Sequence, residues 1–308
     1  MQWDADEIPK LIERALAEDI GASDVTVAAT IPETAVGQAH IVANQELVCS
    51  GLPVAERVFR RLDPQMRVEL RAGDGQLVQK SQEVLHLLGK AAAILSGERT
   101  ALNFLGHLSG IATLTRRFVE QLSGTRAKIR DTRKTTQGLR QLGKYTVKMG
   151  GTNHRFGLYD AILLKENHIA LAGGVKAALD QAHAYASSQG KLCAMTAYEA
   201  VGSSASEREA NSLSIQIEVR DGEELREAQA AGAESVLLDN MTPEEARRCV
   251  EMVQGIRVSC TVEISGGITL ENARAYALTV ADYLSSGALT HSAKSADLSL
   301  LVDSIKEK

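Results

Sequence analysis

Apolar residues in the opening third of the chain follow first a helical and then a strand-like pattern. Between Ile8 and Ala17 they recur at the spacing of one helix face, which predicts an amphipathic helix. From Gly37 to Leu88 they form short runs that are separated by turn-forming residues. A second helix is predicted over 53–62, where Pro53 lies near the start. We therefore expect a small α+β domain here.

The segment from Ala91 to Leu122 has the apolar periodicity of one long helix or a pair of helices. Gly106 and Gly110 share one face of this helix, with three residues between them. In a soluble helix, two such glycines indicate close packing against another backbone. We assign them no functional role.

After Ala127 the chain alternates between strand-like and helix-like segments. The strand-like runs are 127–131, 160–167, 213–220, 234–240, 258–266 and 280–287. Helix-like segments at 173–186, 222–233, 242–253 and 269–277 separate several of them. Such alternation, with nearly continuous apolar strands, predicts a parallel sheet covered by helices. Six units in a row favour a TIM-like barrel over an open sheet. The polar stretch 187–212 interrupts the rhythm, and we expect a long surface loop there.

Composition excludes several classes of protein. The formal net charge of −5 and an aromatic content of 4% argue against a general nucleic-acid binder. The start of the chain is acidic and lacks the basic region and apolar run of a signal peptide, and no apolar window reaches transmembrane length. The four cysteines show no metal-ligand spacing. These features predict a cytoplasmic protein with reduced thiols.

Against this acidic background, the segment from Lys128 to His168 is strongly cationic, which predicts an anionic ligand. In α/β barrels the active site lies at the carboxyl ends of the strands. Those ends carry Arg133, Lys134, Lys165, Glu218, Asp239, Ser265, Gly266, Gly267, Gly287 and His291.

Each of these residues has a plainer interpretation. Arg133 and Lys134 can belong to a solvated turn, Glu218 and Asp239 can cap helices, and the glycines can form tight turns. Their concentration at one end of the predicted barrel favours a site. Glycines there leave backbone N–H groups open to a phosphate.

Other kinds of active site find no support in the sequence. It has no metal-binding cluster, no GxxxxGK[ST] loop and no GxGxxG motif. The cations, two separate acids and glycines suit a substrate with carboxylates together with a phosphorylated sugar. Any Mg²⁺ would then be held mainly by the phosphates of the substrate itself.

Six motifs, in order along the chain, closely resemble the quinolinate phosphoribosyltransferase family. They are ERTALNFLGHLSGIATLT, KIRDTRKTTQGLR, NHRFGLYDAILLKENH, VLLDN, EISGGI and SSGALTHS. The resemblance runs from about residue 10 to the C-terminus. It implies an N-terminal α/β sandwich domain, residues 1–110 with about 285–308 returning to it, and an incomplete TIM-like α/β barrel, residues 111–284.

The resemblance also implies the activity, that of a pentosyltransferase of NAD biosynthesis. Phosphoribosyl pyrophosphate and quinolinate, with Mg²⁺, would give nicotinate mononucleotide, CO₂ and pyrophosphate. The protein would be a homodimer, with further assembly left open.

Residue roles follow from the same resemblance. Arg133, Lys134, His154, Arg155 and Lys165 would hold the quinolinate carboxylates, and Arg99 would reach into the site of the partner subunit. Glu218 and Asp239 would contact the ribose or its Mg²⁺. Ser265, Gly266, Gly267, Gly287 and His291 would surround the 5′-phosphate. Lys134, Lys165, Glu218 and Asp239 would be catalytic.

The chain departs from the family pattern at three places in this region. Gln137 stands where a proline is usual, the glycine run before Asn153 is one residue short, and Gln216 replaces an acid. Two alternatives share the scaffold: an accessory protein of molybdenum transport and a non-catalytic anion-binding protein. The intact NHR and DTRKT motifs disfavour the first, and the presence of Glu218 and Asp239 disfavours the second.

Overall fold

The computed structural model describes residues 7–189, 213–256 and 259–306, which form two compact units. Unit 1 is built from Arg117–Thr135 and Gly151–His291. Unit 2 is built from Gln2–Arg116, Thr136–Gly150 and Ser292–Lys308. Most of the expected loop 187–212 lies outside the described residues. No helix among the described residues is both long and apolar enough to span a bilayer.

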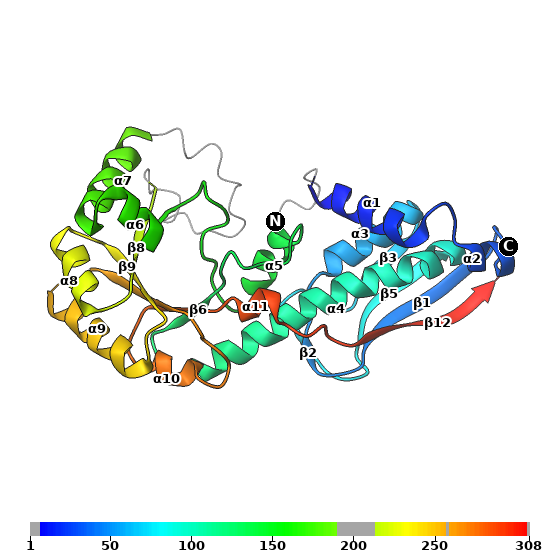
Figure 1. Cartoon of the computed structure of the whole chain (residues 1–308). Coiled ribbons are helices and arrows are strands. Elements are labelled where there is room, and N and C mark those ends of the chain that lie inside the picture. Colours follow the sequence, from blue (N-terminus) through cyan, green and yellow to red (C-terminus); the bar gives the residue numbers. More distant parts are fainter. Residues whose placement is uncertain (1–6, 190–212, 257–258, 307–308) are drawn as a thin grey trace. The chain divides into compact units, whose positions relative to one another are not determined.

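Unit 2 contains an antiparallel sheet of four strands in the order β12-β1-β5-β3 (Figure 1). These strands are β1 (Val36–Ala43), β3 (Arg67–Leu70), β5 (Glu83–Lys90) and β12 (Leu298–Lys306), and a separate small pair joins β2 (Leu47–Val48) to β4 (Leu77–Val78). Helices α1 (Glu7–Ile20), α2 (Val25–Thr30), α3 (Leu52–Leu62) and α4 (Ala91–Gln121) complete this part.

The core of unit 2 forms between the sheet and the helices. Ala39 and Ile41 of β1 and Leu85 and Leu87 of β5 are fully buried at alternating positions. Helix α4 packs so closely on β1 that a Cβ atom at Gly37 would lie 3.3 Å from Cδ1 of Ile94. The predicted α+β character of the opening third is therefore confirmed, and 91–121 is one helix.

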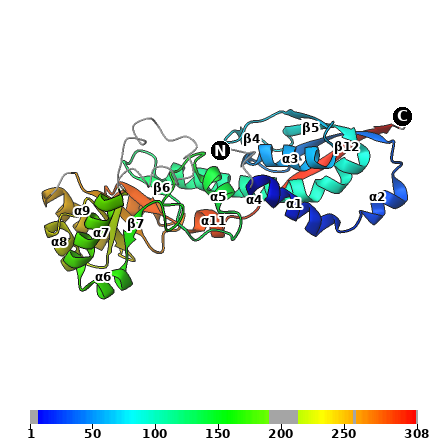
Figure 2. The same cartoon turned by 90° about the horizontal axis from the view of Figure 1, so that it is seen from above.

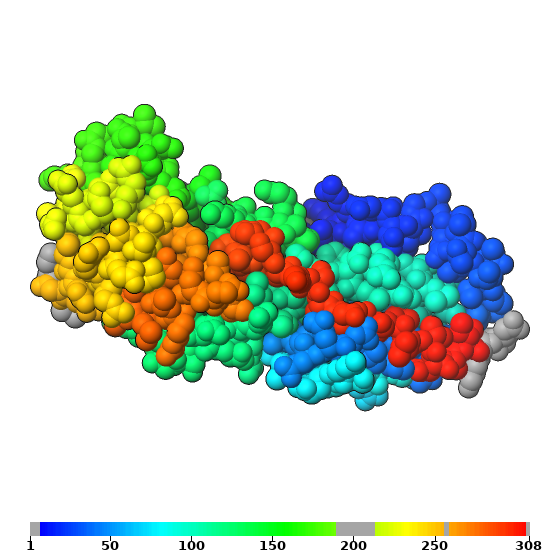
Figure 3. Space-filling view, turned by 60° about the horizontal axis from the view of Figure 1, so that its bottom comes forward, coloured from blue at the N-terminus to red at the C-terminus, as the bar shows by residue number. Residues whose placement is uncertain are grey.

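The C-terminal strand β12 pairs with β1, far away in sequence, and forms one edge of the sheet. In the space-filling view it lies open on the surface of unit 2, in red (Figure 3). The chain reaches it by passing directly over α4: a Cβ atom at Gly110 would lie 2.1 Å from the carbonyl oxygen of Lys294, and Ala296 donates its N–H to the carbonyl of Gly106. The prediction that these two glycines serve close backbone packing is confirmed.

Residues 136–150, with helix α5 (Arg140–Val147), lie in unit 2, although the sequence placed them within the barrel domain. Two side-chain hydrogen bonds hold them there. The Tyr145 hydroxyl donates to Oδ2 of Asp74 at 2.9 Å, and the Thr146 hydroxyl contacts that of Ser50 at 3.0 Å. Lys144 also lies in this helix and is fully buried.

Unit 1 contains six parallel strands in the order β6-β11-β10-β9-β8-β7. Their bounds are β6 (Lys128–Arg130), β7 (Ile162–Leu164), β8 (Ile215–Val219), β9 (Ser235–Asp239), β10 (Thr261–Ser265) and β11 (Tyr283–Ser285). Within the described residues the outer strands β6 and β7 form no ladder with each other, so the strands seen there do not close a barrel. All six predicted strands are confirmed.

Helices follow the strands of unit 1. They are α6 (Glu166–Ala172), α7 (Val175–Gln189), α8 (Gly222–Ala230), α9 (Pro243–Ile256), α10 (Ala273–Ala277) and α11 (Ala288–His291). In two views, α7, α8 and α9 cover the outer face of the sheet (Figures 1 and 2). Helix α9 starts with a capping box, because Thr242 donates its N–H to Glu245 and Glu245 donates its own to the Thr242 hydroxyl. Helix α10 is shorter than predicted, and α5 and α6 were not predicted.

Candidate functional site

The parallel register of unit 1 brings the carboxyl ends of its strands together at one edge. Ser265 of β10 pairs with Asp239 of β9 on one side and with Ser285 of β11 on the other. Ser285 in turn pairs with Arg130 of β6. Residues that lie far apart in the sequence therefore form one row, and the loops that follow these strands meet above it.

Two arginines from different loops lie near each other above this row. Arg133 follows β6, and Arg155 precedes β7 and donates from Nη1 to the carbonyl of Ala161 at 3.2 Å. Burial lowers the pKa of the Arg155 guanidinium, the positive charge of Arg133 lowers it further, and Asp160 acts in the opposite direction. Two partly desolvated cations that repel each other are stabilised by an anion between them.

Polar atoms beside these arginines lack protein partners. Nε of Arg133 and Oδ1 of Asn153 are both buried, and neither has a hydrogen-bond partner within the described part of the chain. Buried polar atoms without a partner are rare in proteins and indicate a place for a ligand or water. This region thus has the charge and the open hydrogen bonds expected of a carboxylate site.

His154 connects the arginine loop to the interior of the barrel. Its backbone N–H donates to Oδ1 of the fully buried Asp131 at 2.8 Å, its Nδ1 faces the backbone N–H of Arg155 at 2.8 Å, and its Nε2 faces Oε1 of Gln216 at 3.1 Å. Both ring nitrogens therefore contact protein atoms.

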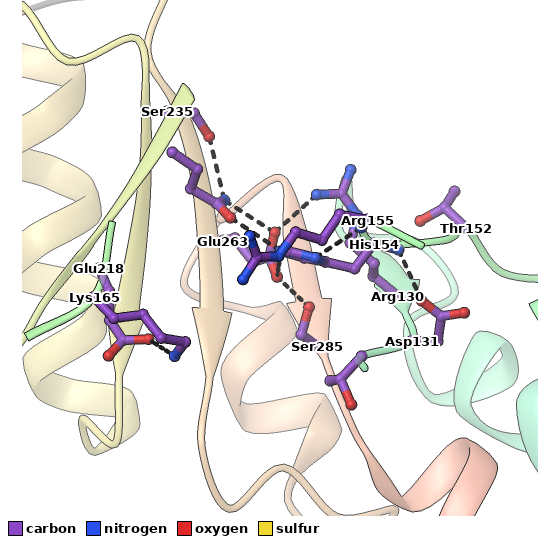
Figure 4. A network of polar contacts seen from close by, with 12 residues as sticks. Arg130, Asp131, Thr152, His154, Arg155, Lys165, Glu218, Ser235, Glu263 and Ser285 are labelled. Atoms are coloured by element: carbon purple, nitrogen blue, oxygen red, sulfur yellow. Dashed lines mark hydrogen bonds and ion pairs between the residues drawn. The ribbon is translucent and has the colours of Figure 1, made fainter. Parts of the chain in front are cut away.

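Next to His154, a polar network joins side chains of β6, β8, β10 and β11 (Figure 4). Its centre is Glu263 of β10, which is fully buried. Glu263 accepts hydrogen bonds from Nη1 of Arg130 at 2.8 Å, from Nε2 of Gln216 at 3.1 Å and from the hydroxyl of Ser285. The sequence interpretation missed Glu263 and Arg130. The available signal was a glutamate between two apolar residues, Val262 and Ile264, of a predicted strand.

Lys165 and Glu218 form an ion pair to one side of this network (Figure 4). Pairing of Leu164 with Ile217 places the two residues opposite each other at the ends of β7 and β8. The Glu218 side chain is 10% exposed and that of Lys165 is 47% exposed. A ligand can therefore reach the ammonium group directly. Asp239, one strand further, accepts a hydrogen bond from Nδ2 of Asn240 at 2.7 Å.

A third part of the edge is built from glycines. Gly266 and Gly267 follow β10 with φ of +93° and +63°, a backbone conformation that favours glycine. A Cβ atom at Gly266 would lie 2.2 Å from Oδ1 of Asn240. At Gly287, after β11, a Cβ atom would lie 2.9 Å from Nε2 of His291 and 3.2 Å from Cδ of Lys134.

Gly287 therefore leaves room where Lys134 and His291 approach each other, and Lys134 is held there by the Thr290 hydroxyl, which donates to its carbonyl at 3.1 Å. All predicted site residues from Arg133 to His291 belong to unit 1. Arg99 is exposed on α4 in unit 2.

The donor set of this edge suits a metal that is bound mainly by a substrate. Among the described residues, no group of three or more His, Cys, Asp or Glu side chains is arranged to hold an ion. Glu218 and Asp239 offer single carboxylates from neighbouring strands. Mg²⁺ is commonly bound in this way, through one or two carboxylates together with substrate phosphates.

Comparison with known proteins gives matches over nearly the whole chain. A family model described as the N-terminal domain of quinolinate phosphoribosyl transferase matches residues 24–109. The model of the C-terminal domain of the same family matches in two overlapping stretches, residues 111–201 and 191–301. A probable nicotinate-nucleotide pyrophosphorylase [carboxylating] of Bacillus subtilis (strain 168) is 39% identical over 295 residues, which cover 96% of this chain and 93% of that protein.

A second relative and a solved structure agree. The nicotinate-nucleotide pyrophosphorylase [carboxylating] of Mycobacterium leprae (strain TN) is 39% identical over 293 residues, 94% of this chain and 95% of that protein. The structure of the nicotinate-nucleotide pyrophosphorylase from Francisella tularensis superimposes with a TM-score of 0.85 at 34% identity, covering 97% of this chain and 96% of the other.

Proposed function

Because this chain belongs to the quinolinate phosphoribosyl transferase family, we propose that it transfers the phosphoribosyl group of phosphoribosyl pyrophosphate to quinolinate. The product loses CO₂ and becomes nicotinate mononucleotide, an intermediate of NAD biosynthesis. The observation that carries this proposal within the site is the pair Arg133 and Arg155. Two adjacent guanidinium groups match a ligand with two neighbouring carboxylates, and each can form a forked hydrogen-bond pair with one of them.

Lys165 provides a third positive charge for the same ligand. In the structure its ammonium group pairs with Glu218 and remains half exposed. A carboxylate of quinolinate would take the exposed side of this ammonium. Nε of Arg133 would then donate to a carboxylate of the ligand, and Oδ1 of Asn153 would accept from a water molecule that accompanies it.

The sugar phosphate is assigned to the glycine-lined part of the edge. Lys134 and His291 meet across Gly287, and the open backbone after β10 adds N–H groups at Gly266 and Gly267. Ser265 lies at the start of this turn. This combination of cations and exposed N–H groups is suited to the 5′-phosphate. Lys134 can also stabilise the departing pyrophosphate.

Glu218 and Asp239 are assigned to the ribose and to Mg²⁺. Phosphoribosyl pyrophosphate carries the phosphates that bind most of the ion, and the two carboxylates would supply its protein ligands. The ion would neutralise charge on the pyrophosphate. The two acids also place negative charge near C1′, where positive charge develops as the leaving group departs.

The chemistry follows from this arrangement. Pyrophosphate leaves C1′ with the bonding electron pair, and the pyridine nitrogen of quinolinate forms the new bond to C1′. The electron pair of the broken bond stays on the ring carbon when the adjacent carboxylate leaves as CO₂, the neighbouring pyridinium charge stabilises it, and that carbon then takes a proton from water. No covalent bond to the protein is required. The main contribution of the protein is to hold two anionic substrates in contact.

We further propose a homodimer in which Arg99 completes the site of the partner subunit. Its support is the match of the ERTALNFLGHLSGIATLT segment to the family and the exposure of Arg99 on α4. The function itself is tested by incubating the purified protein with both substrates and Mg²⁺. Nicotinate mononucleotide and CO₂ should form in equal amounts, and a product that retains both carboxylates would contradict the proposal.

A further inference from the structure

His154 carries an imidazole whose two nitrogens both face protein atoms at hydrogen-bond distance. Nδ1 lies 2.8 Å from the backbone nitrogen of Arg155, and Nε2 lies 3.1 Å from Oε1 of Gln216. The role expected from the sequence, a cation that binds a carboxylate of quinolinate, requires at least one ring N–H that points at the ligand. The contacts of the ring therefore bear directly on how His154 acts.

The orientation of the Gln216 amide follows from its neighbours. Its Nε2 lies 3.1 Å from Oε2 of Glu263, the oxygen that also accepts a hydrogen bond from Arg130. A carboxylate oxygen paired with a guanidinium acts as an acceptor, so the amide NH₂ of Gln216 must face it. The same NH₂ contacts the hydroxyl of Ser235 at 3.2 Å. The amide oxygen of Gln216 is left for His154.

The protonation of His154 follows in turn. Because the oxygen of Gln216 can only accept, and because Oε1 of the Glu263 carboxylate also lies 3.7 Å from Nε2, this ring nitrogen must carry a hydrogen. Because the backbone N–H of Arg155 can only donate, Nδ1 must offer its lone pair. These two requirements together describe the neutral imidazole with hydrogen on Nε2. An imidazolium would bring an N–H of Nδ1 against the N–H of Arg155.

We propose that His154 is a positioning residue that fixes the backbone of Arg155, and that it does not itself bind quinolinate. Asp131 holds the backbone N–H of His154 at 2.8 Å and lies two residues before Arg133. The two arginine loops are therefore joined through Asp131 and His154, and Gln216 with Glu263 fixes the ring. This inference rests on the proposed function, because it concerns how the two arginines are aligned for a dicarboxylate.

Two substitutions separate positioning from direct binding. In His154→Asn the side-chain oxygen can take the place of Nδ1, whereas in His154→Gln the amide takes the place of Nε2. If the ring acts through Nδ1, His154→Asn should raise the KM for quinolinate roughly threefold and His154→Gln roughly tenfold or more, since one hydrogen bond is worth about 1 kcal/mol. The KM for phosphoribosyl pyrophosphate should change by less than about twofold. Equal effects on the quinolinate KM, or the reverse order, would overturn the proposal.

A measurement on the unmodified protein keeps the inference testable if either variant folds poorly. Nitrogen-15 NMR of histidine-labelled protein distinguishes a protonated ring nitrogen from one with a lone pair, and the signals of His154 are those lost in whichever of the two variants folds. Near neutral pH and without substrates, we expect hydrogen on Nε2 and a lone pair on Nδ1. A doubly protonated ring, or hydrogen on Nδ1, would contradict the inference.

Arg133→Ala should be assayed in parallel. If it leaves the quinolinate KM unchanged, the proposed dicarboxylate site itself is wrong. If it raises that KM while the two His154 variants show equal effects or the reverse order, the site stands and the role given to His154 is wrong.

Discussion

Arg133 and Arg155 approach each other from two different loops, so that the charge of Arg133 lowers the pKa of Arg155. The protein thus keeps two partly desolvated cations together, and Asp160 offsets part of their repulsion at Arg155. The free energy that this repulsion costs is recovered when a dianion binds. Under the proposed function, such a preformed arrangement would favour a ligand with two adjacent carboxylates over a ligand with one.

Replacing Arg133 with alanine should therefore weaken quinolinate binding specifically. The loss of a forked, charge-assisted contact should raise the KM for quinolinate roughly 10- to 100-fold, with a much smaller change for phosphoribosyl pyrophosphate. Lys128→Ala is a matched control, since Lys128 belongs to the same cationic segment but is exposed on β6. Steady-state kinetics with each substrate varied in turn measures both values. Equal increases for the two substrates would refute the role of Arg133.

Glu218→Gln should act on the chemical step. The neutral amide keeps the shape of the side chain but removes negative charge near C1′, so kcat should fall roughly 100-fold. The quinolinate KM should change less. Glu166→Gln serves as the control, because Glu166 is an exposed acid next to Lys165 in the sequence that pairs with Arg220 at 3.4 Å. A kcat that survives Glu218→Gln would remove this residue from the mechanism.

Gly266→Ala tests the glycine turn after β10. The positive φ and the 2.2 Å approach to Asn240 should together cost roughly 1–3 kcal/mol of folding free energy, visible as a lower Tm. The KM for phosphoribosyl pyrophosphate should rise as well. Gly255→Ala is the counterpart, since Gly255 is in helix α9 with nothing within 4 Å of its Cβ position. Gly255→Ala should leave the Tm unchanged or raise it. If Gly266→Ala and Gly255→Ala lower the Tm by the same amount, Gly266 is not under strain.

The buried Asp74 gives unit 2 a pH-dependent stability. Burial raises its pKa above the ordinary value of 3.8, while hydrogen bonds from Gly51, Leu52 and Tyr145 act in the opposite direction. Between 3.8 and the raised value, the folded state binds more protons than the unfolded state, so this group's contribution to stability falls as pH rises. The amide of Asp74→Asn does not titrate. The Tm of the wild type minus the Tm of this variant should therefore be smaller at pH 7 than at pH 4. A larger value at pH 7 would contradict the expected direction of the pH dependence.

Mixing inactive subunits tests the shared site. If Arg99 serves the partner subunit, a mixture of Arg99→Ala and Lys165→Ala chains contains heterodimers in which one site has neither defect. After random exchange, about one quarter of the wild-type activity should return. Mass spectrometry of differently labelled chains verifies that exchange has occurred. Exchange without recovery of activity would place Arg99 outside the partner's site.

The sequence predicted the strand-end residues because their signal is local. An apolar run followed by Lys165, or by Asp239, marks a strand and its end together. The resemblance motifs then assigned roles to those positions. For the same reason the six barrel strands were found, although their pairing order came only from the structure.

What the sequence did not reveal depends on contacts between distant segments. Glu263 is charged and lies in an apolar strand, and only the approach of Arg130 from another strand explains how it can be buried. Gln216 was noted as the loss of an acid, whereas the structure shows an amide that bridges Glu263 and His154. The placement of 136–150 in unit 2 likewise depends on Asp74 and Ser50, which precede it by many residues.

The most direct test of the central claim compares two acceptors with the same enzyme. Quinolinate carries two adjacent carboxylates, and nicotinate carries one. Because the site pairs two guanidinium groups, kcat/KM for quinolinate should exceed that for nicotinate by at least about 100-fold. This is roughly the loss in binding expected when one forked, charge-assisted contact between a guanidinium and a carboxylate is missing. Phosphoribosyl pyrophosphate and Mg²⁺ are held constant, and nicotinate mononucleotide is measured in both reactions. Equal values of kcat/KM for the two acceptors would contradict the dicarboxylate site.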